Sequence, residues 1–316
     1  MYEQIAKNKR RTFLLLFFFV ALIAAAALAF NYLLGFGAIG VVVAIVFAIA
    51  MAWGSYFYSD RVALAASRAK PAEGPEYQRY HNLVEGLCIA AGLPKPRLYV
   101  VDDPAPNAFA AGRNPKHAAL AVTTGLLETM NRVELEGVIA HELSHVKNYD
   151  ILVTTVAVTA VGAIALLSDL GLRFMWFGGG DRRDRADSGG AGIILVILAF
   201  ALLILAPFIA LLMQFAVSRR RELLADASGV QLTRYPPGLI AALEKLKDDK
   251  AVVHHATRAT AQMWIESPLE RGPAGSGSED AVDAEDGDGQ KKGSWLNRAF
   301  DTHPPLDERI RILKEM

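Results

Sequence analysis

The feature that most constrains the fold is a long uncharged stretch near the amino terminus. No charged residue occurs between Arg11 and Asp60. The hydrocarbon core of a bilayer is ~30 Å thick and one helical crossing takes about 20 residues, so this stretch is long enough for two crossings. Polar and glycine residues at 31–37 divide it, which predicts one span near 13–31 and another near 37–54.

Two later apolar runs predict two more spans. They cover residues 151–172 and 192–217, and Pro207 inside the second run is tolerated in a membrane helix. Hydrophobic residues make up 53% of the chain and the mean hydropathy is +0.25, both above what a water-soluble chain of this size needs. We therefore expect a membrane protein whose four transmembrane helices form two hairpins in a lipid bilayer.

The first span has a second interpretation. Basic residues from Lys7 to Arg11 precede an apolar run that ends in Ala27-Leu28-Ala29, which resembles a secretory signal with a small-residue cleavage site. The apolar run is longer than a usual signal core, however, and a second span follows almost at once. We therefore expect the first span to remain as a membrane anchor.

Positive charge near the span ends predicts the orientation. The amino terminus is basic, Arg61 follows the second span, and Arg219 to Arg221 follow the fourth. These charges place the amino terminus, residues 59–150 and the carboxy-terminal third in the cytoplasm, although the link between spans three and four also carries arginines. We expect a multi-pass protein of the cell (inner or plasma) membrane with a cytoplasmic catalytic domain.

The segments outside the spans predict one mixed α/β domain in two parts. A first transmembrane hairpin would occupy 1–58 and a second one 151–217. The α/β domain would then consist of 59–150 and 218–316. Within its second part, residues 271–293 are rich in Gly, Ser and acidic residues with almost no apolar content, which is typical of a disordered loop.

Local signals predict the elements of this domain. An amphipathic helix over 77–92 should end at Gly92, because Pro94 prevents its continuation. Asn131 can cap a later helix, with Glu134 reaching back to complete a capping box. Strands are expected at 97–103, 107–112 and 117–125, and further helices from about 218 and from 236 to about 247.

The helix that Asn131 caps contains the pattern His141-Glu142-Leu143-Ser144-His145. Side chains four residues apart lie on one helix face, so both imidazoles can reach one metal ion. Glu142 beside the first histidine can take a proton from water. The alternative interpretation is that both histidines are ordinary surface residues that bind no metal. Imidazole and carboxylate ligands indicate zinc rather than a harder cation.

A catalytic zinc site needs three protein ligands and one open position. A metzincin-type motif would need Gly at 148 and His at 151, where this chain has Asn148 and Ile151. Glu222 is the leading candidate for the third ligand, because a two-span hairpin returns the chain to the side of the membrane it left. Asp226, one helical turn later, could accept a hydrogen bond from a ligand imidazole. Asp150 is expected to pair with an arginine.

Charge and cysteine content exclude other classes. Lysine plus arginine balance aspartate plus glutamate at 33 each, so no nucleic-acid partner is indicated. Cys88 is the single cysteine, which excludes an internal disulfide, and its apolar surroundings predict a buried core residue.

The spans carry almost no charge, which argues against transport. His254 and His255 are adjacent and cannot both serve one metal easily.

Three motifs together resemble a known family. HELSH, then SRRRELLAD after an apolar hairpin, then THPPLDERI look like the HtpX family of membrane zinc endopeptidases, which is related to the CAAX prenyl endopeptidases. The resemblance covers nearly the whole chain and implies one Zn²⁺ held by His141, His145 and Glu222. It also implies Glu142 as general base and Asp226 as the hydrogen-bond partner of a ligand imidazole.

The resemblance extends to substrate recognition. It implies that a strand edge holds the substrate as an added strand, and that either His303 or Arg309 stabilises the oxyanion. Residues 254–265 match the family only loosely, and 271–293 look like an insertion. The edge consists of Asn107, Ala108, Phe109, Ala110 and Gly112.

These observations predict metal-assisted hydrolysis of peptide bonds, with Glu142 as the base and no acyl-enzyme. The resemblance suggests protein or peptide substrates, in particular misfolded or damaged membrane proteins, and hence protein quality control under stress. A CAAX-type processing peptidase is a narrower alternative. A non-catalytic membrane scaffold or chaperone with structural zinc is an alternative of another class, although it would not need Glu142.

Overall fold

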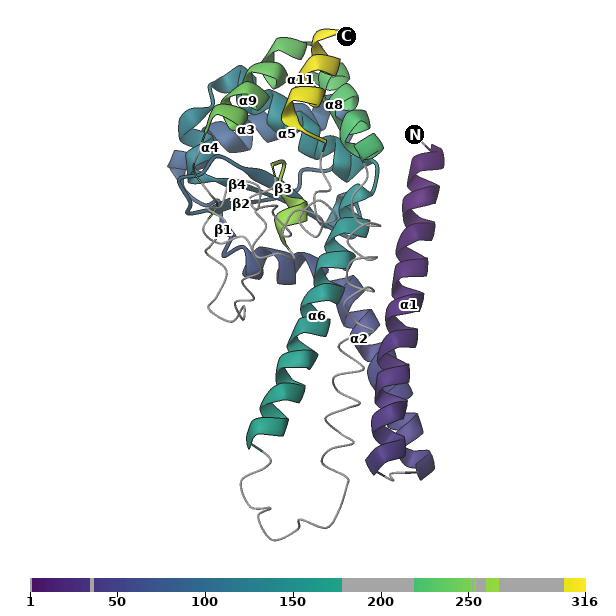
Figure 1. Cartoon of the computed structure of the whole chain (residues 1–316). Coiled ribbons are helices and arrows are strands. Elements are labelled where there is room, and N and C mark those ends of the chain that lie inside the picture. Colours follow the sequence, from purple (N-terminus) through teal and green to yellow (C-terminus); the bar gives the residue numbers. More distant parts are fainter. Residues whose placement is uncertain are drawn as a thin grey trace, which may run out of the picture.

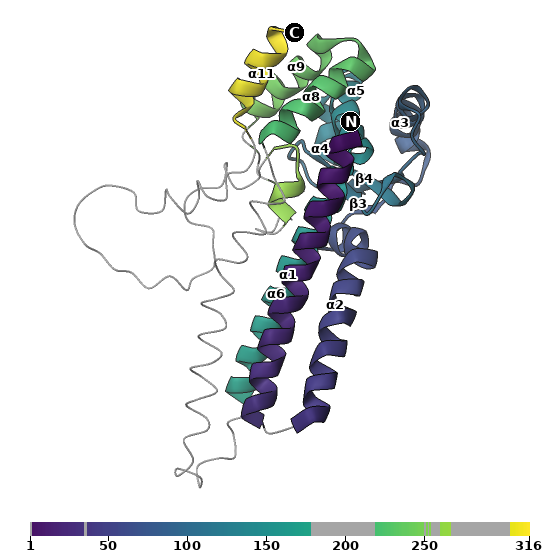
Figure 2. The same cartoon turned by 90° about the vertical axis from the view of Figure 1, so that its right-hand side faces the viewer.

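The computed structural model describes residues 2–34, 37–177, 219–249, 251, 253, 260–266 and 304–316. These residues form a head, which contains the sheet and the shorter helices, and a stalk of three long helices that run away from it (Figures 1 and 2). The stalk helices are α1 (Tyr2–Leu34), α2 (Gly37–Ala66) and α6 (Asp150–Phe177). The predicted spans at 13–31, 37–54 and 151–172 lie in these helices, whereas 192–217 and the loop 271–293 lie outside the described residues.

The stalk buries a small apolar core and leaves much apolar surface outside. Phe19 of α1, Ala48 of α2 and Val153 of α6 lie in the shared core. Other apolar side chains of α1 and α2 are exposed, such as Phe13 and Ile39. Among the described helices, α2 is long and apolar enough to cross a membrane by length and hydropathy alone. The four crossings therefore stay a prediction.

The sheet of the head has four strands. The sequence predicts the three longer ones, and the short strand at 70–71 is an addition. The strands are β1 (Lys70–Pro71), β2 (Arg97–Val101), β3 (Ala108–Gly112) and β4 (Ala118–Thr123), in the order β1-β2-β4-β3. β2 and β4 are parallel, and the other pairs are antiparallel. β3 therefore forms one edge of the sheet, and its residues are buried against α5 and α6.

Two helices of the head have an end at a predicted signal. α3 (Gln78–Ala91) ends at Gly92, which has a φ of +66° that favours glycine. α5 (Arg132–Lys147) begins at Asn131, whose side chain accepts from the Glu134 backbone N–H while the Glu134 carboxylate accepts from the Asn131 N–H. The capping box is thus confirmed, and it fixes the start of the helix that carries the two histidines.

Two helices from the second part of the chain pack against α5. They are α8 (Arg219–Thr233) and α9 (Pro236–Asp248). Gly229 lets α8 approach closely, because a Cβ there would lie 3.0 Å from the backbone nitrogen of His141. Shorter elements complete the head, namely η1 (Pro75–Tyr77), η2 (Pro115–His117), α4 (Thr124–Thr129), η3 (Thr260–Met263) and α11 (Leu306–Lys314).

Candidate metal centre

Three predicted ligands converge between α5 and α8. The Nε2 atoms of His141 and His145 are 3.1 Å apart, and the two carboxylate oxygens of Glu222 face them, with Oε2 3.6 Å from His141 Nε2 and Oε1 3.6 Å from His145 Nε2. All three ligand atoms are within 4.8 Å of one another. The spacing of four residues on α5 brings the two imidazoles together, and the close α5–α8 contact at Gly229 brings the carboxylate to them.

Each imidazole is oriented by a carboxylate on its other nitrogen. His141 Nδ1 lies 2.8 Å from Asp226 Oδ1, and His145 Nδ1 lies 3.1 Å from Asp150 Oδ2. An Nδ1–H that donates to a carboxylate leaves Nε2 with a lone pair. Two such lone pairs facing each other at 3.1 Å repel unless a cation lies at the site. Two imidazoles and a carboxylate therefore fit Zn²⁺.

The electrostatics of the site also favour a positive charge. Burial has the largest effect on the pKa of His141 and lowers it, but the charge of Asp226 and the hydrogen bonds to Asp226 and Glu222 together raise that pKa above its ordinary value. Burial likewise lowers the pKa of His145, while Glu222 and Asp150 raise it well above its ordinary value. The acidic groups thus stabilise positive charge between the two rings, where a metal ion would supply it.

Asp226 is held by Arg309 of α11. The Arg309 Nε and Nη2 atoms donate to the two Asp226 oxygens at 2.8 and 2.6 Å, and Nη1 donates to the Ile265 carbonyl at 3.2 Å. Arg309 is 0% exposed. Although burial raises the pKa of Asp226, Arg309 and His141 together hold that pKa well below its usual range. Asp226 is therefore ionised and fixed behind His141.

Asp150 has a larger part in the site than the sequence indicates. The predicted arginine partner is present, since Arg221 Nη1 lies 3.9 Å from Asp150 Oδ1. The other oxygen contacts His145, and Asn8 of α1 donates to Asp150 Oδ1 at 2.7 Å. The one sequence signal for this role is an aspartate placed just after the histidine helix. The contact joins the stalk to a candidate ligand.

Glu142 is buried beside this cluster. Its side chain is 2% exposed, and burial raises the pKa of its carboxyl group while the neighbouring imidazoles partly oppose that change. A carboxylate with a raised pKa holds a proton more strongly, which suits a group that must accept one from water near neutral pH.

The predicted substrate edge is partly covered. Ile265 N–H donates to the Ala108 carbonyl at 2.9 Å, and Asn107 Nδ2 donates to the Glu266 carbonyl at 2.9 Å. Phe109 packs edge-to-face on Trp264, with ring centroids 4.7 Å apart. Residues 260–266 thus lie along the start of β3, an arrangement that the sequence does not predict. Ala110 and Gly112 complete the edge, and His303 and residues 254–259 lie outside the described residues.

A buried cluster of two histidines and a glutamate, with a second glutamate beside it, defines a metal-dependent peptidase. Residues 75–316 match the family model described as peptidase family M48. The chain belongs to peptidase family M48, and it is a zinc metallopeptidase.

Curated relatives match over the whole chain. A "Protease HtpX homolog" of Caldanaerobacter subterraneus subsp. tengcongensis is 40% identical over 316 residues, which cover 100% of this chain and 98% of the relative. A protein of the same description from Streptococcus gordonii is 42% identical over 322 residues and all of both chains. The crystal structure of S. mikatae Ste24p aligns with a TM-score of 0.45 and 16% identity, over 99% of this chain and 67% of that one.

Proposed function

We propose that the protein is a membrane-anchored zinc endopeptidase whose general base is Glu142. The observation that carries the proposal is the buried glutamate directly beside three converging ligand atoms. A structural zinc site has four protein ligands and no need of a base next to one of them. This favours a hydrolase over a scaffold or chaperone that uses zinc only for structure.

The residues of the site divide the work of hydrolysis. Zinc, when bound by His141, His145 and Glu222, polarises the scissile carbonyl and acidifies water. Glu142 takes the proton of the attacking water and passes it to the leaving amine. Asp226 and Asp150 hold the two imidazoles in the tautomer and orientation that ligation requires.

The family resemblance allows either His303 or Arg309 to stabilise the oxyanion. The donors of Arg309 are directed to Asp226 and the Ile265 carbonyl, so we assign Arg309 to holding Asp226 behind His141. His303 remains the proposed oxyanion donor. The substrate would pair with β3 as an added strand near Ala110, because residues 260–266 cover the start of the strand and the Gly112 N–H donates to Thr155 Oγ1 at 3.1 Å.

The stalk supports membrane anchoring. We propose that residues 1–58 and 151–217 form two transmembrane hairpins, of which α1, α2 and α6 are three spans. The exposed apolar side chains of α1 and α2 support this placement. The two parts of the peptidase domain, 59–150 and 218–316, would face the cytoplasm of a cell whose inner or plasma membrane holds the protein.

A site beside the bilayer suits substrates that the bilayer presents. We propose misfolded or damaged membrane proteins as the substrate class, and hence a role in protein quality control. The relatives are described as protease HtpX homologues, which agrees with proteolysis. A CAAX-type processing role would need a chamber within the membrane, which four spans could hardly enclose.

The first test replaces Glu142 by glutamine in the full-length protein in mild detergent. We expect cleavage of unfolded casein to fall by at least roughly 10²–10⁴-fold, because the amide cannot accept the proton of water. Zinc content, measured by inductively coupled plasma mass spectrometry, should remain at one ion per chain because Glu142 is not a ligand.

Glu136→Gln is the matched control, since it makes the same change on the same helix. It should retain wild-type cleavage. If Glu142→Gln cleaved casein as fast as Glu136→Gln, the base would lie elsewhere. If wild-type protein bound zinc yet cleaved nothing, the scaffold interpretation would replace the peptidase one.

A further inference from the structure

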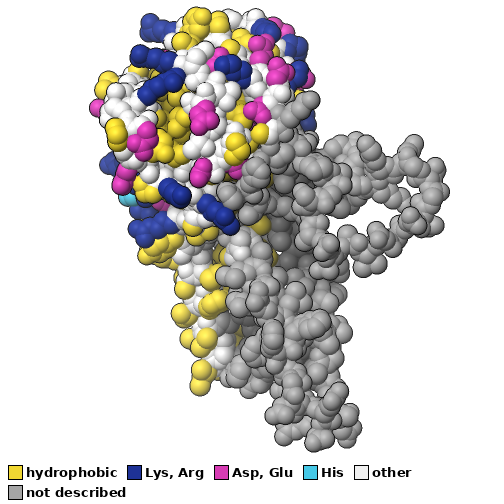
Figure 3. Space-filling model, turned by 90° about the vertical axis from the view of Figure 1, so that its left-hand side faces the viewer, with side chains coloured by type: hydrophobic (Ala, Val, Ile, Leu, Met, Phe, Trp, Pro, Cys, Tyr) yellow, Lys and Arg dark blue, Asp and Glu magenta, His cyan; other side chains and the backbone are white. Residues whose placement is uncertain are grey.

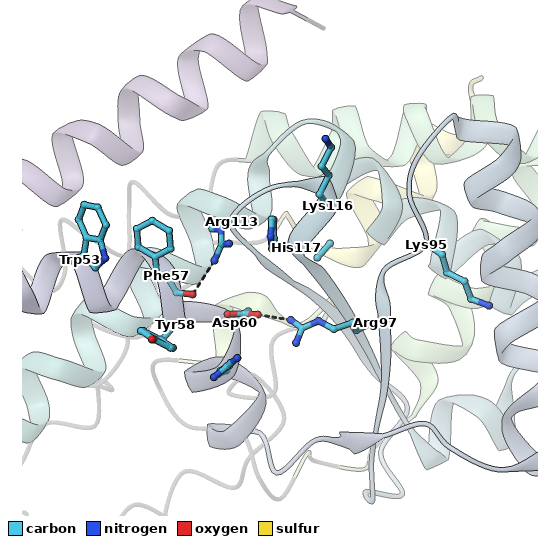
Figure 4. A pocket seen from close by; sticks show the side chains of 11 residues that line it. Trp53, Phe57, Tyr58, Asp60, Lys95, Arg97, Arg113, Lys116 and His117 are labelled. Atoms are coloured by element: carbon cyan, nitrogen blue, oxygen red, sulfur yellow. Dashed lines mark hydrogen bonds and ion pairs between the residues drawn. The ribbon is translucent and has the colours of Figure 1, made fainter.

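A cavity of about 500 Å³ lies where the end of α2 meets the head (Figure 4), and none of the candidate metal ligands lines it. Its walls come from α2, from the start of β2 and from the connection between β3 and β4. The residues that line it fall into two chemical groups. One is aromatic and belongs to α2, and the other is basic and belongs mostly to the head.

The basic group gives the cavity a strong positive charge. Five lining residues are lysine or arginine and one, Asp60, is acidic. Asp60 is paired with Arg97. Within the part of the chain that the structure describes, Arg61, Arg113 and Lys116 have no carboxylate partner, and Figure 4 shows Arg113 directed toward α2. Three cations therefore remain available to an anionic ligand.

The aromatic group indicates the level of the membrane at which the cavity opens. Trp53 and Tyr58 are 64% and 54% exposed at the head end of α2, immediately before its first charged residues, Asp60 and Arg61. Trp and Tyr prefer the level of the lipid headgroups, where an apolar span gives way to charge. Figure 3 shows lysine and arginine side chains gathered where the head meets the apolar stalk. The cavity therefore opens at headgroup depth.

The basic and aromatic side chains also contact each other. Arg113 lies over the Phe57 ring at 4.9 Å from its centroid, and its Nη1 donates to the Phe57 carbonyl at 3.2 Å. Arg61 lies over the Tyr58 ring at 5.4 Å. These contacts hold two guanidinium groups in place, and an ordered guanidinium binds phosphate oxygens with a smaller loss of side-chain entropy.

We propose that this cavity binds the phosphate headgroup of an anionic phospholipid from the membrane in which the stalk is placed. The inference rests on the membrane anchoring proposed above, but not on the peptidase chemistry. Arg61, Arg113 and Lys116 contact the phosphate, and Phe57 with Trp53 packs against the glycerol and upper acyl carbons. Basic pockets beside transmembrane helices recognise anionic lipids in this way. A water-soluble phosphate would make no use of the aromatic wall.

The test uses full-length protein in a neutral detergent, to which phosphatidylglycerol or phosphatidylcholine is added. Native mass spectrometry measures the lipid bound to each chain. We expect wild-type protein to retain phosphatidylglycerol in preference to phosphatidylcholine. Arg61→Gln combined with Lys116→Gln should weaken phosphatidylglycerol binding by roughly 30-fold, and each single change by roughly fivefold. Both side chains are exposed, so the substitutions spare the folded core.

The matched control is Arg132→Gln combined with Arg311→Gln, which removes the same charge from exposed positions outside the cavity. It should bind phosphatidylglycerol as the wild type does. Equal binding by the two double variants would overturn the proposal. So would displacement of the lipid by glycerol 1-phosphate at the same concentration, since the ligand would then be a soluble phosphate. Casein cleavage and zinc content, measured in parallel, separate this outcome from failure of the peptidase assignment.

Discussion

At the scale of single residues, the centre depends on charges that are buried in pairs. Asp226 faces both His141 and Arg309, and Asp150 faces His145, Asn8 and Arg221. Removing one member of such a pair leaves the other desolvated and uncompensated. The carboxylates behind the ligands therefore matter for the stability of the site as well as for its chemistry.

Asp150→Asn tests the carboxylate behind His145. The amide keeps an acceptor for Asn8 but loses the charge that holds the His145 Nδ1–H, so we expect zinc affinity to fall roughly 10–100-fold. Competition with a chromophoric chelator measures that affinity. Asp102→Asn, at an exposed position, is the control and should bind zinc as the wild type does. Unchanged zinc affinity in Asp150→Asn would remove Asp150 from the site.

Cys88 should be chemically inert in the folded protein. The side chain is 3% exposed, and burial raises the pKa of its thiol to about 11. Since the thiolate is the reactive form, only roughly one thiol in ten thousand would be ionised at pH 7. Iodoacetamide should leave native Cys88 unmodified and label it after unfolding in urea, as followed by mass spectrometry. Rapid labelling of the native protein would contradict this burial.

At the scale of elements, the site depends on how closely α8 approaches α5. Gly229 and Glu222 are seven residues apart, about two turns, and so share one face of α8. Contact of Gly229 with the His141 backbone therefore sets the distance between Glu222 and the two imidazoles. Because Gly229 has no side chain, α8 can lie close enough to α5 for Glu222 to reach the two imidazoles.

Gly229→Ala should move α8 away from α5. The added Cβ would meet the backbone nitrogen and Cα of His141 at 3.0 and 3.2 Å, where backbone cannot rotate away. We expect about 1–3 kcal/mol of destabilisation and weaker zinc binding, measured by chemical unfolding and chelator competition. Gly86→Ala in α3, with nothing within 4 Å, should be neutral or slightly stabilising. Similar zinc affinity in both variants would argue against control by this helix contact.

Local elements could be predicted from the sequence because their causes are local. The Asn131 capping box and the glycine after α3 act within a few residues, and the spacing of His141 and His145 is a property of one helix. The contact of Asp150 with His145 is different. A spacing of five does not place two residues on one helix face, and the contact needs the break at Tyr149, whose φ is +60°.

Other parts of the site could not be predicted from the sequence because their causes are distant. Arg309 and Asp226 are separated by 83 positions, and Arg309 and His141 by 168. The cover of β3 by residues 260–266 depends on packing of Trp264 against Phe109. No helical or strand period relates these residues, so a single sequence carries no sign of the pairing.

At the scale of the whole molecule, the centre joins segments that lie far apart in the chain. α5 supplies two ligands, α8 supplies the third, and α11 supplies the arginine that fixes Asp226. The amino-terminal helix reaches the same place through Asn8 and Asp150. A bound metal ion therefore stabilises the packing of the head as well as performing chemistry.

Removal of the metal should lower the thermal stability of the head. A ligand that binds only the folded state at about 1,000 times its dissociation constant contributes roughly 4 kcal/mol, so we expect EDTA to lower the Tm by roughly 10 °C. Glu142→Gln should show the same decrease because Glu142 is not a ligand. Differential scanning fluorimetry in detergent measures both. A Tm that is unchanged after complete loss of zinc would mean that the metal does not join α5 and α8.

The distribution of the ligands along the chain has a consequence for biosynthesis. A nascent polypeptide that has been translated as far as residue 150 already carries His141, Glu142 and His145, yet Glu222 is still to be made. Arg309, which fixes the orientation of His141 through Asp226, is made later still. A nascent chain therefore cannot form the complete zinc site. The protein can hydrolyse peptide bonds of its substrates only after most of the chain has been synthesised.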